Sequence, residues 1–197
     1  MKRRFFYLSL LFVMFGLGMA FQTKDYFWCV FPIVQGGILA FTLFIKNASI
    51  NKLTFKDIRY GILSGILLYV LFALGKIVVI TLFPTLFNNL LGLYELIQPR
   101  TWWHTLLVFM IIIPAEEMFW RGFVQQKLRD PTIHPVLISS SLYALAHLAS
   151  GSLLLVLSAL LAGFVWGFLY VRSQNILVPL LSHLVFDLLL FIIFPLL

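Results

Sequence analysis

The sequence predicts an all-α polytopic membrane protein with about seven transmembrane helices, folded as a single integral membrane domain over residues 1–197. The first observation is composition, because 62% of the residues are hydrophobic and only 11% are charged, whereas soluble domains are about 25% charged. The second is that apolar stretches long enough to cross about 30 Å of hydrocarbon occupy nearly the whole chain. The lipid bilayer is therefore the expected surroundings, and no soluble module is expected.

Seven apolar runs define the predicted spans. The first ends in Gly18-Met19-Ala20, a small-x-small pattern typical of signal peptidase sites, and cleavage there would leave six spans. Pro114 and several charges interrupt the fourth run, and the segment Leu90 to Gln98 is too short to cross, which favours an interfacial or re-entrant piece. The runs are Phe5 to Phe21, Phe27 to Ile45, about Tyr60 to Phe83, Trp102 to about Leu128, about His134 to Ala149, Leu153 to Val171, and Ile176 to the C-terminus.

The formal charge of +7 reflects membrane topology rather than binding to nucleic acid, because the basic residues lie between apolar runs and form no polar face. A cytoplasmic N-terminus and an external C-terminus satisfy the positive-inside rule. We therefore expect a multi-pass protein of the cell membrane in this orientation. The outside then receives only Lys24 and Arg100, and the cytoplasmic side receives Lys2, Arg3, Arg4, Lys46, Lys52, Lys56, Arg59, Lys127, Arg129 and Arg172.

Two pairs of glycines have the spacing that lets apolar helices approach closely. Gly61 and Gly65 lie in the third run, and Gly163 and Gly167 lie in the sixth. Small residues four positions apart share one face of a helix and admit a neighbouring backbone. We expect both pairs to pack helices within the chain.

Ionisable residues inside the predicted spans are the candidates for function, because each costs about 2.5–3.5 kcal/mol at a helix centre on insertion scales. Most of them fall in the last four spans, where an i,i+4 spacing places two side chains on one helix face. Glu117 therefore faces Arg121, His183 faces Asp187, and Tyr143 accompanies His147. The ionisable residues are Lys76, Glu116, Glu117, Arg121, His147, His183 and Asp187.

Glu116 is the least constrained of these residues. It is turned about 100° from Glu117 on a helix, so it cannot share the ion pair with Arg121 equally. Counted along their helices at about 1.5 Å per residue, Glu116, His147, His183 and Asp187 all lie about 10 to 20 Å from the cytoplasmic ends, so they could meet in one layer. Lys76 lies apart from this layer, and we expect it to snorkel or to pair with one of the acids.

Two kinds of chemistry suit such a layer. A desolvated carboxylate is a competent general base for water, and a neighbouring imidazole can hold the water or stabilise an oxyanion. Alternatively, Glu116, His147 and His183 could ligate a divalent metal such as zinc. The sequence leaves both open, so the cofactor is either none or such a metal.

Three motifs in this region resemble those of the CPBP family of CAAX proteases and bacteriocin-processing enzymes, also called the Abi family. Residues 116–121 read EEMFWR and match EExxxR, residues 143–147 read YALAH and match FxxxH, and residues 183–187 read HLVFD and match HxxxN. The similarity covers about residues 102–190, which is the predicted catalytic core in the last four spans.

The resemblance implies an intramembrane endopeptidase that hydrolyses a bond of a peptide or membrane-protein substrate. Glu116 would activate water, His147 and His183 would surround the water and the oxyanion, and Glu117 with Arg121 would support them. Tyr143 replaces the usual Phe and adds a hydroxyl that needs a partner. Asp187 replaces the more usual Asn and would orient His183 or ligate a metal, because an ionised carboxylate cannot donate to an oxyanion.

Two other functions compete with the protease. The first is a non-catalytic membrane scaffold or regulator of the same fold. Loss of the motif residues would favour it, and the motif residues are present. A proton-coupled transporter also uses buried acids and histidines, but it predicts an inverted repeat, which the sequence lacks.

Overall fold

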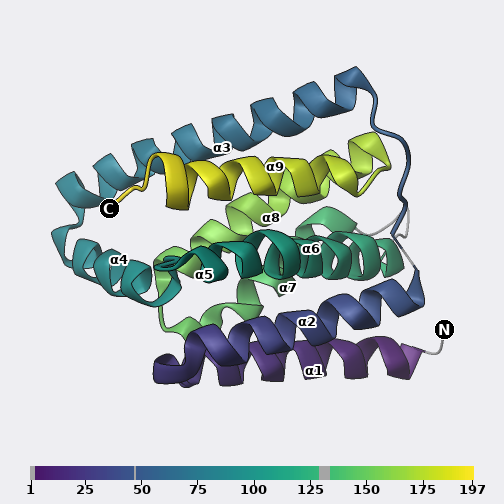
Figure 1. The fold of residues 1–197 in the computed structure, drawn as a ribbon, viewed down its shortest axis with the longest axis horizontal. Helices are drawn as coiled ribbons and strands as arrows, with labels where there is room; N and C mark the ends of the chain where they lie inside the picture. Colours follow the sequence, from purple (N-terminus) through teal and green to yellow (C-terminus); the bar gives the residue numbers. More distant parts are fainter. Residues whose placement is uncertain (1–2, 47, 129–133) are drawn as a thin grey trace.

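The computed structural model describes residues 3–46, 48–128 and 134–197, and every element in these ranges is helical (Figure 1). The α-helices are α1(Arg3–Gln22), α2(Phe27–Ile45), α3(Phe55–Leu82), α4(Pro84–Ile97), α5(Trp102–Leu107), α6(Ile113–Glu116), α7(Pro135–Ala146), α8(Leu153–Ser173) and α9(Leu177–Leu188). Short 3-10 turns are η1(Lys24–Tyr26) and η4(Leu148–Ser150), and π-helical segments are η2(Val108–Ile112), η3(Glu117–Gln125) and η5(Leu189–Ile193).

Within the described ranges, 4 helical segments are long and apolar enough to cross a membrane, namely Arg4–Gln22, Lys24–Ile45, Phe55–Leu82 and Leu153–Ser173. The segments Pro135–Ser150 and Leu177–Ile193 are apolar but shorter. The protein is thus an all-helical integral membrane protein. The exact count of seven spans stays a prediction.

The helices form layers that bring distant parts of the chain together. In Figure 1, α1 and α2 form one edge of the molecule, α3 and α9 form the opposite edge, and α5 and α6 run between them. The helices α7 and α8 pack against each other behind this middle segment. Residues far apart in sequence, on α2, α6, α7 and α9, can therefore face one another in the interior.

Close glycine packing holds two of these helix pairs, as the spacing predicted. A Cβ on Gly61 would lie 2.9 Å from Leu181 Cδ2, and one on Gly65 would lie 2.5 Å from the main-chain oxygen of Ser182, so both glycines pack on α9. A Cβ on Gly163 would lie 3.1 Å from Tyr143 Cδ1, and one on Gly167 would lie 2.8 Å from Gln125 Oε1. Both pairs therefore pack helices within the chain.

The fourth apolar run folds as one long helical segment with irregular winding. The α-helical turn Ile113–Glu116 contains Pro114 and is flanked by π-helical turns on both sides. Proline lacks an N–H donor, so the regular hydrogen-bond ladder is interrupted at this point. Wide π turns inside helices are frequent at functional sites, and here they flank Glu116 and contain Glu117.

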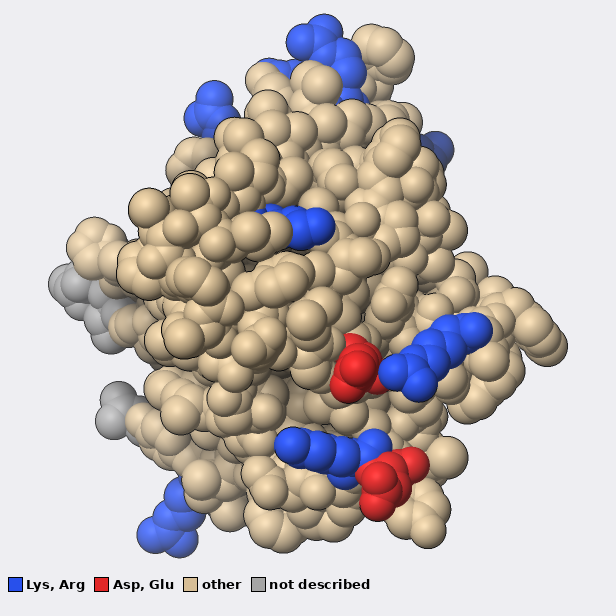
Figure 2. Space-filling model, turned by 90° about the vertical axis from the view of Figure 1, so that its left-hand side faces the viewer, with Lys and Arg blue, Asp and Glu red and all other residues tan. Residues whose placement is uncertain are grey.

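The two ends of the molecule differ in charge. One end of the fold holds the start of α1, the connection from α2 to α3 with Lys46 and Lys52, the first turn of α3 with Lys56, and the end of α8 with Arg172 (Figure 1). Figure 2 shows the opposite end, where most of the surface is uncharged and acidic side chains lie beside basic ones. Lys46, Lys52, Lys56 and Arg172, which the sequence placed on one side of the membrane, thus lie at one end of the fold, whereas Lys2 and Arg129 lie outside the described residues.

Candidate active site

Glu116 ends α6 and is held by two donors from other helices. Gln35 Nε2 on α2 donates to Glu116 Oε1 at 3.0 Å, and the Tyr143 hydroxyl on α7 donates to Glu116 Oε2 at 2.5 Å. Glu116 is only 6% exposed, and its carboxylate has no ion pair with Arg121 in the described structure. Each carboxylate oxygen therefore has one protein donor and keeps lone-pair capacity for a further ligand.

Glu117 occupies a different environment one residue later. Its Oε1 lies 3.2 Å from Arg121 Nη1, the contact that the i,i+4 spacing predicted, and 2.9 Å from His183 Nδ1. Glu117 is 0% exposed and Arg121 is 1% exposed. The contact with His183 joins η3 to α9, and removal of Arg121 would leave an uncompensated buried charge on Glu117.

Aromatic rings enclose the Arg121 guanidinium and the His183 imidazole. Arg121 Cζ lies 4.8 Å from the Tyr143 ring centroid and 5.2 Å from that of Trp166 on α8. Trp166 also stacks on the His183 ring with 3.6 Å between the centroids. These contacts fix the planes of both groups and shield the Glu117 ion pair from solvent.

The position of His147 at the end of α7 defines which ring nitrogen can act on a substrate. Nδ1 lies 2.9 Å from the main-chain oxygen of Tyr143, which can only accept, so Nδ1 carries the proton. In the neutral imidazole Nε2 then has a free lone pair. The ring also contacts the Tyr143 ring edge-on, with 4.8 Å between the centroids.

His183 and Asp187 form the third part of the site. His183 Nε2 lies 3.6 Å from Asp187 Oδ2, which is within ion-pair distance but too long for a hydrogen bond. Since His183 Nδ1 faces Glu117, the ring lies between two carboxylates. Asp187 thus faces His183, as the spacing predicted.

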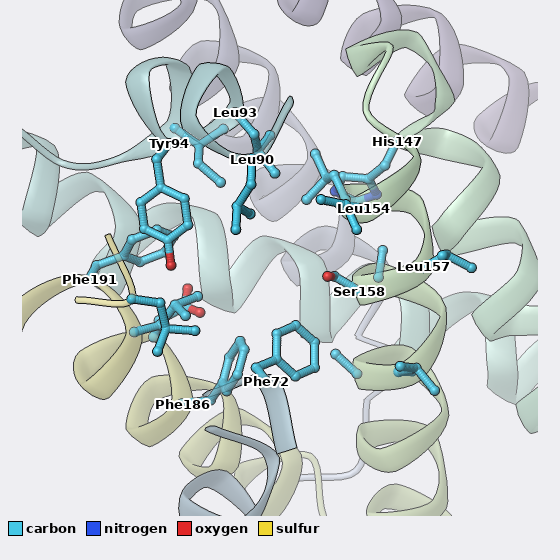
Figure 3. Close-up of a pocket in the computed structure, with 18 of the residues that line it drawn as sticks. Phe72, Leu90, Leu93, Tyr94, His147, Leu154, Leu157, Ser158, Phe186 and Phe191 are labelled. Atoms are coloured by element: carbon cyan, nitrogen blue, oxygen red, sulfur yellow. The ribbon is translucent and has the colours of Figure 1, made fainter. Parts of the chain in front are cut away.

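A cavity of about 530 Å³ joins these residues. In Figure 3, Tyr94 and Phe191 lie on one side of it and His147 and Leu154 on the other, while Phe72 and Phe186 lie below. Most of the lining is aliphatic or aromatic, so the cavity suits an apolar ligand with a few polar groups. The site residues that line it are Glu116, Tyr143, His147, His183 and Asp187.

The hypothesis that Glu116, His147 and His183 ligate a metal stays a prediction. Among the described residues, no group of three or more His, Cys, Asp or Glu side chains is arranged to hold one. In each histidine Nδ1 faces a protein oxygen, which is also the usual arrangement of a histidine that ligates a metal through Nε2.

Sequence reasoning missed two residues of the site. Gln35 is the only carboxamide in its apolar run, a signal that the emphasis on ionisable groups passed over. Trp166 has no distinguishing signal, because tryptophan is common in membrane helices. Of the two alternatives expected for Lys76, snorkelling or pairing with an acid, the pairing is not found among the described residues, where its Nζ donates to the main-chain oxygen of Leu196.

Comparison with known proteins found a similarity for the segment that contains most of these residues. Residues 98–189 match the model of the Rce1-like family, described as type II CAAX prenyl endopeptidase Rce1-like. The match confirms the resemblance to CAAX proteases and covers somewhat less than half of the chain. Neither the search of curated proteins nor the search of solved structures found a match.

Proposed function

From the match to a family of CAAX-type proteases, we propose that this chain is an intramembrane endopeptidase in which Glu116 activates the attacking water. The observation that carries the proposal is that Glu116, His147 and His183 line one apolar cavity although they come from three separate helical segments. A buried carboxylate that has no ion pair among the described residues and lines the same cavity as a histidine with a free ring nitrogen has the composition of a general-base site.

The first step is attack on the peptide carbonyl. A water between Glu116 and His147 gives one proton to the Glu116 carboxylate, and His147 Nε2 accepts its second O–H bond as a hydrogen bond. The water oxygen forms a bond to the carbonyl carbon, whose π electrons move to oxygen and create an oxyanion. Gln35 and Tyr143 hold the Glu116 carboxylate in place during this transfer.

The second step is collapse of the tetrahedral intermediate. The C–N bond breaks as the oxyanion re-forms the carbonyl, and Glu116 returns its proton to the departing nitrogen. His183 donates to the oxyanion through Nε2 when both of its ring nitrogens carry protons, with Glu117 accepting from Nδ1. The products are a carboxylic acid and an amine, and the site returns to its starting protonation state.

Asp187 acts in this scheme by orienting His183. An ionised carboxylate cannot donate to the oxyanion, so Asp187 stabilises the doubly protonated imidazole from 3.6 Å. This role differs from that of a carboxamide at the same position, which could donate directly. The chain therefore relies on one histidine for oxyanion stabilisation.

The same proposal includes the orientation in the membrane. The N-terminus and the basic connections gathered at one end of the fold face the cytoplasm, and the C-terminus faces the outside. The substrate is a membrane-associated peptide or protein segment, because the cavity is mostly apolar.

The test is cleavage of prenylated and unmodified apolar peptides by the purified protein in detergent. We expect Glu116→Gln and His147→Ala to reduce cleavage by about 10²-fold or more, the range for loss of general acid–base catalysis. A chelator arm measures any contribution of a metal. Ser173→Ala, a change on α8 that removes only hydrogen bonds to main-chain atoms of Leu169 and Asn175, is the control and should cleave normally. Equal cleavage by the wild type and both site variants would refute the assignment.

A further inference from the structure

A second cavity of about 240 Å³ lies between α4, the η1 turn and the connection from η4 to α8. These elements are at the end of the fold away from the basic connections (Figure 1). The proposed reaction uses none of the residues that line it. We call it the polar cleft, because most of its lining side chains are polar, and these belong to Lys24, Asn88, Asn89, Ser150 and Ser152.

The site cavity, which is the cavity that Glu116 and His147 line, needs a supply of water. Hydrolysis consumes one water for each bond that is cut, whereas most of the site cavity is lined by aliphatic and aromatic side chains. Apolar cavities in proteins stay dry. A water takes up about 30 Å³ in the liquid, so the polar cleft has room for several waters and the polar partners to hold them.

Leu93 on α4 is the residue that the two cavities share. Its side chain lines both of them and is only 8% exposed. In Figure 3, Leu93 lies at the edge of the site cavity, between Tyr94 and His147. Because one side chain reaches both cavities, the wall between them is one side chain thick at this point.

Two groups continue the polar path beyond Leu93. The main-chain N–H of Ser150 donates to the main-chain oxygen of His147 at 3.1 Å, so the wall of the polar cleft leads directly to this histidine. The Tyr94 hydroxyl is buried and points into the site cavity (Figure 3), and its proton has no acceptor among the described residues. An unsatisfied buried donor of this kind is commonly the partner of an ordered water.

We propose that the water consumed in the reaction enters through the polar cleft and passes Leu93 to reach Glu116 and His147. The proposal rests on the proposed protease function, and it adds the site that supplies one of the two substrates. The carboxamides and hydroxyls of the cleft hold the waters, Leu93 limits their passage, and the Tyr94 hydroxyl donates to a water that has passed. In the proposed orientation the cleft faces the outside, so the water comes from that side.

The test measures water inside the site cavity with a spin label. Cys29→Ser removes the only cysteine of the sequence, and Ser158→Cys provides a new attachment point on α8, where Ser158 lines the site cavity. Deuterium modulation of the electron spin echo in D₂O then reports the water molecules close to the label. We expect clear modulation in this background, and its absence would mean a dry cavity and would overturn the proposal.

Substitutions of Leu93 should change this signal in opposite directions. Leu93→Trp fills the junction and should strongly reduce the modulation, whereas Leu93→Ala widens the junction and should increase it. Leu91→Trp, the matched control, makes the same change at an exposed residue of α4 that lines neither cavity. Unchanged modulation in Leu93→Trp, or an equal loss in Leu91→Trp, would contradict entry past Leu93.

A double variant covers the case in which Leu93→Trp does not fold. Asn88→Leu with Asn89→Leu replaces two exposed carboxamides of the polar cleft by apolar side chains of similar size and leaves the lining of the site cavity unchanged. Loss of modulation in this variant supports the cleft as the source of the water. Modulation equal to that of the background overturns it.

Cleavage assays on the unlabelled wild type separate this proposal from the protease function. Modulation that depends on Leu93 supports the water path even where the wild type cleaves no peptide, a result that counts against the protease function alone. Cleavage by the wild type, together with modulation that does not respond to Leu93, would overturn the water path alone.

Discussion

Replacement of Gln35 by leucine tests whether Glu116 is positioned by a helix outside the matched segment. Gln35 lies on α2, is 1% exposed, and donates from Nε2 to Glu116 Oε1 at 3.0 Å. Leucine has a similar size and suits an apolar helix, so Gln35→Leu removes the donor with little change in packing volume. One oxygen of a buried carboxylate then loses its only protein donor.

The expected effect follows from the strength of this hydrogen bond. Hydrogen bonds to charged groups contribute about 1.5–3 kcal/mol, and about 1.4 kcal/mol corresponds to a factor of ten in rate. If the bond holds Glu116 in its reactive position, Gln35→Leu should lower kcat by about 10-fold to 100-fold. KM should change little, because Gln35 is absent from the cavity lining.

The assay is steady-state cleavage in detergent, with the unfolding temperature measured on the same samples. Thr42→Val is the matched control, because Thr42 is also buried on α2 and its hydroxyl donates only to the main-chain oxygen of Leu39. A purely structural role for Gln35 predicts a lower unfolding temperature with an unchanged kcat. That result, or a kcat within twofold of the wild type, would refute the positioning role.

Two further predictions concern stability. Gly65→Ala should lower the unfolding temperature, because its Cβ would lie 2.5 Å from the main-chain oxygen of Ser182 and such overpacking costs about 1–3 kcal/mol. Gly37→Ala is the control and should leave the unfolding temperature unchanged, because a Cβ there would have nothing within 4 Å. Equal shifts in the two variants would contradict the packing argument. Arg121→Met should strongly reduce the yield of folded protein, because loss of one partner of a buried ion pair costs about 3–5 kcal/mol. The double variant with Glu117→Leu should recover stability in thermal unfolding, and no recovery would argue against the pair as the cause.

Short-range contacts of the site could be predicted from the sequence because helix geometry fixes them. The i,i+4 spacing placed Glu117 beside Arg121 and His183 near Asp187, and both contacts occur in the structure. The π-helical winding of η3 was not predictable in the same way. Its hydrogen-bond pattern depends on the neighbours of the helix as well as on Pro114.

The sequence by itself determined that the protein lies in a membrane, where its apolar runs fall and which of its residues could take part in a reaction. Only the tertiary structure decided which groups meet, because Gln35 and Glu116 are 81 residues apart and Glu117 and His183 are 66 apart. Such contacts depend on how whole helices pack against one another. Glycine pairs and ring stacking together determine that packing. The same reason applies to Lys76. Helix spacing indicated no partner for it, and it becomes part of the cavity wall only because α3 packs against α9.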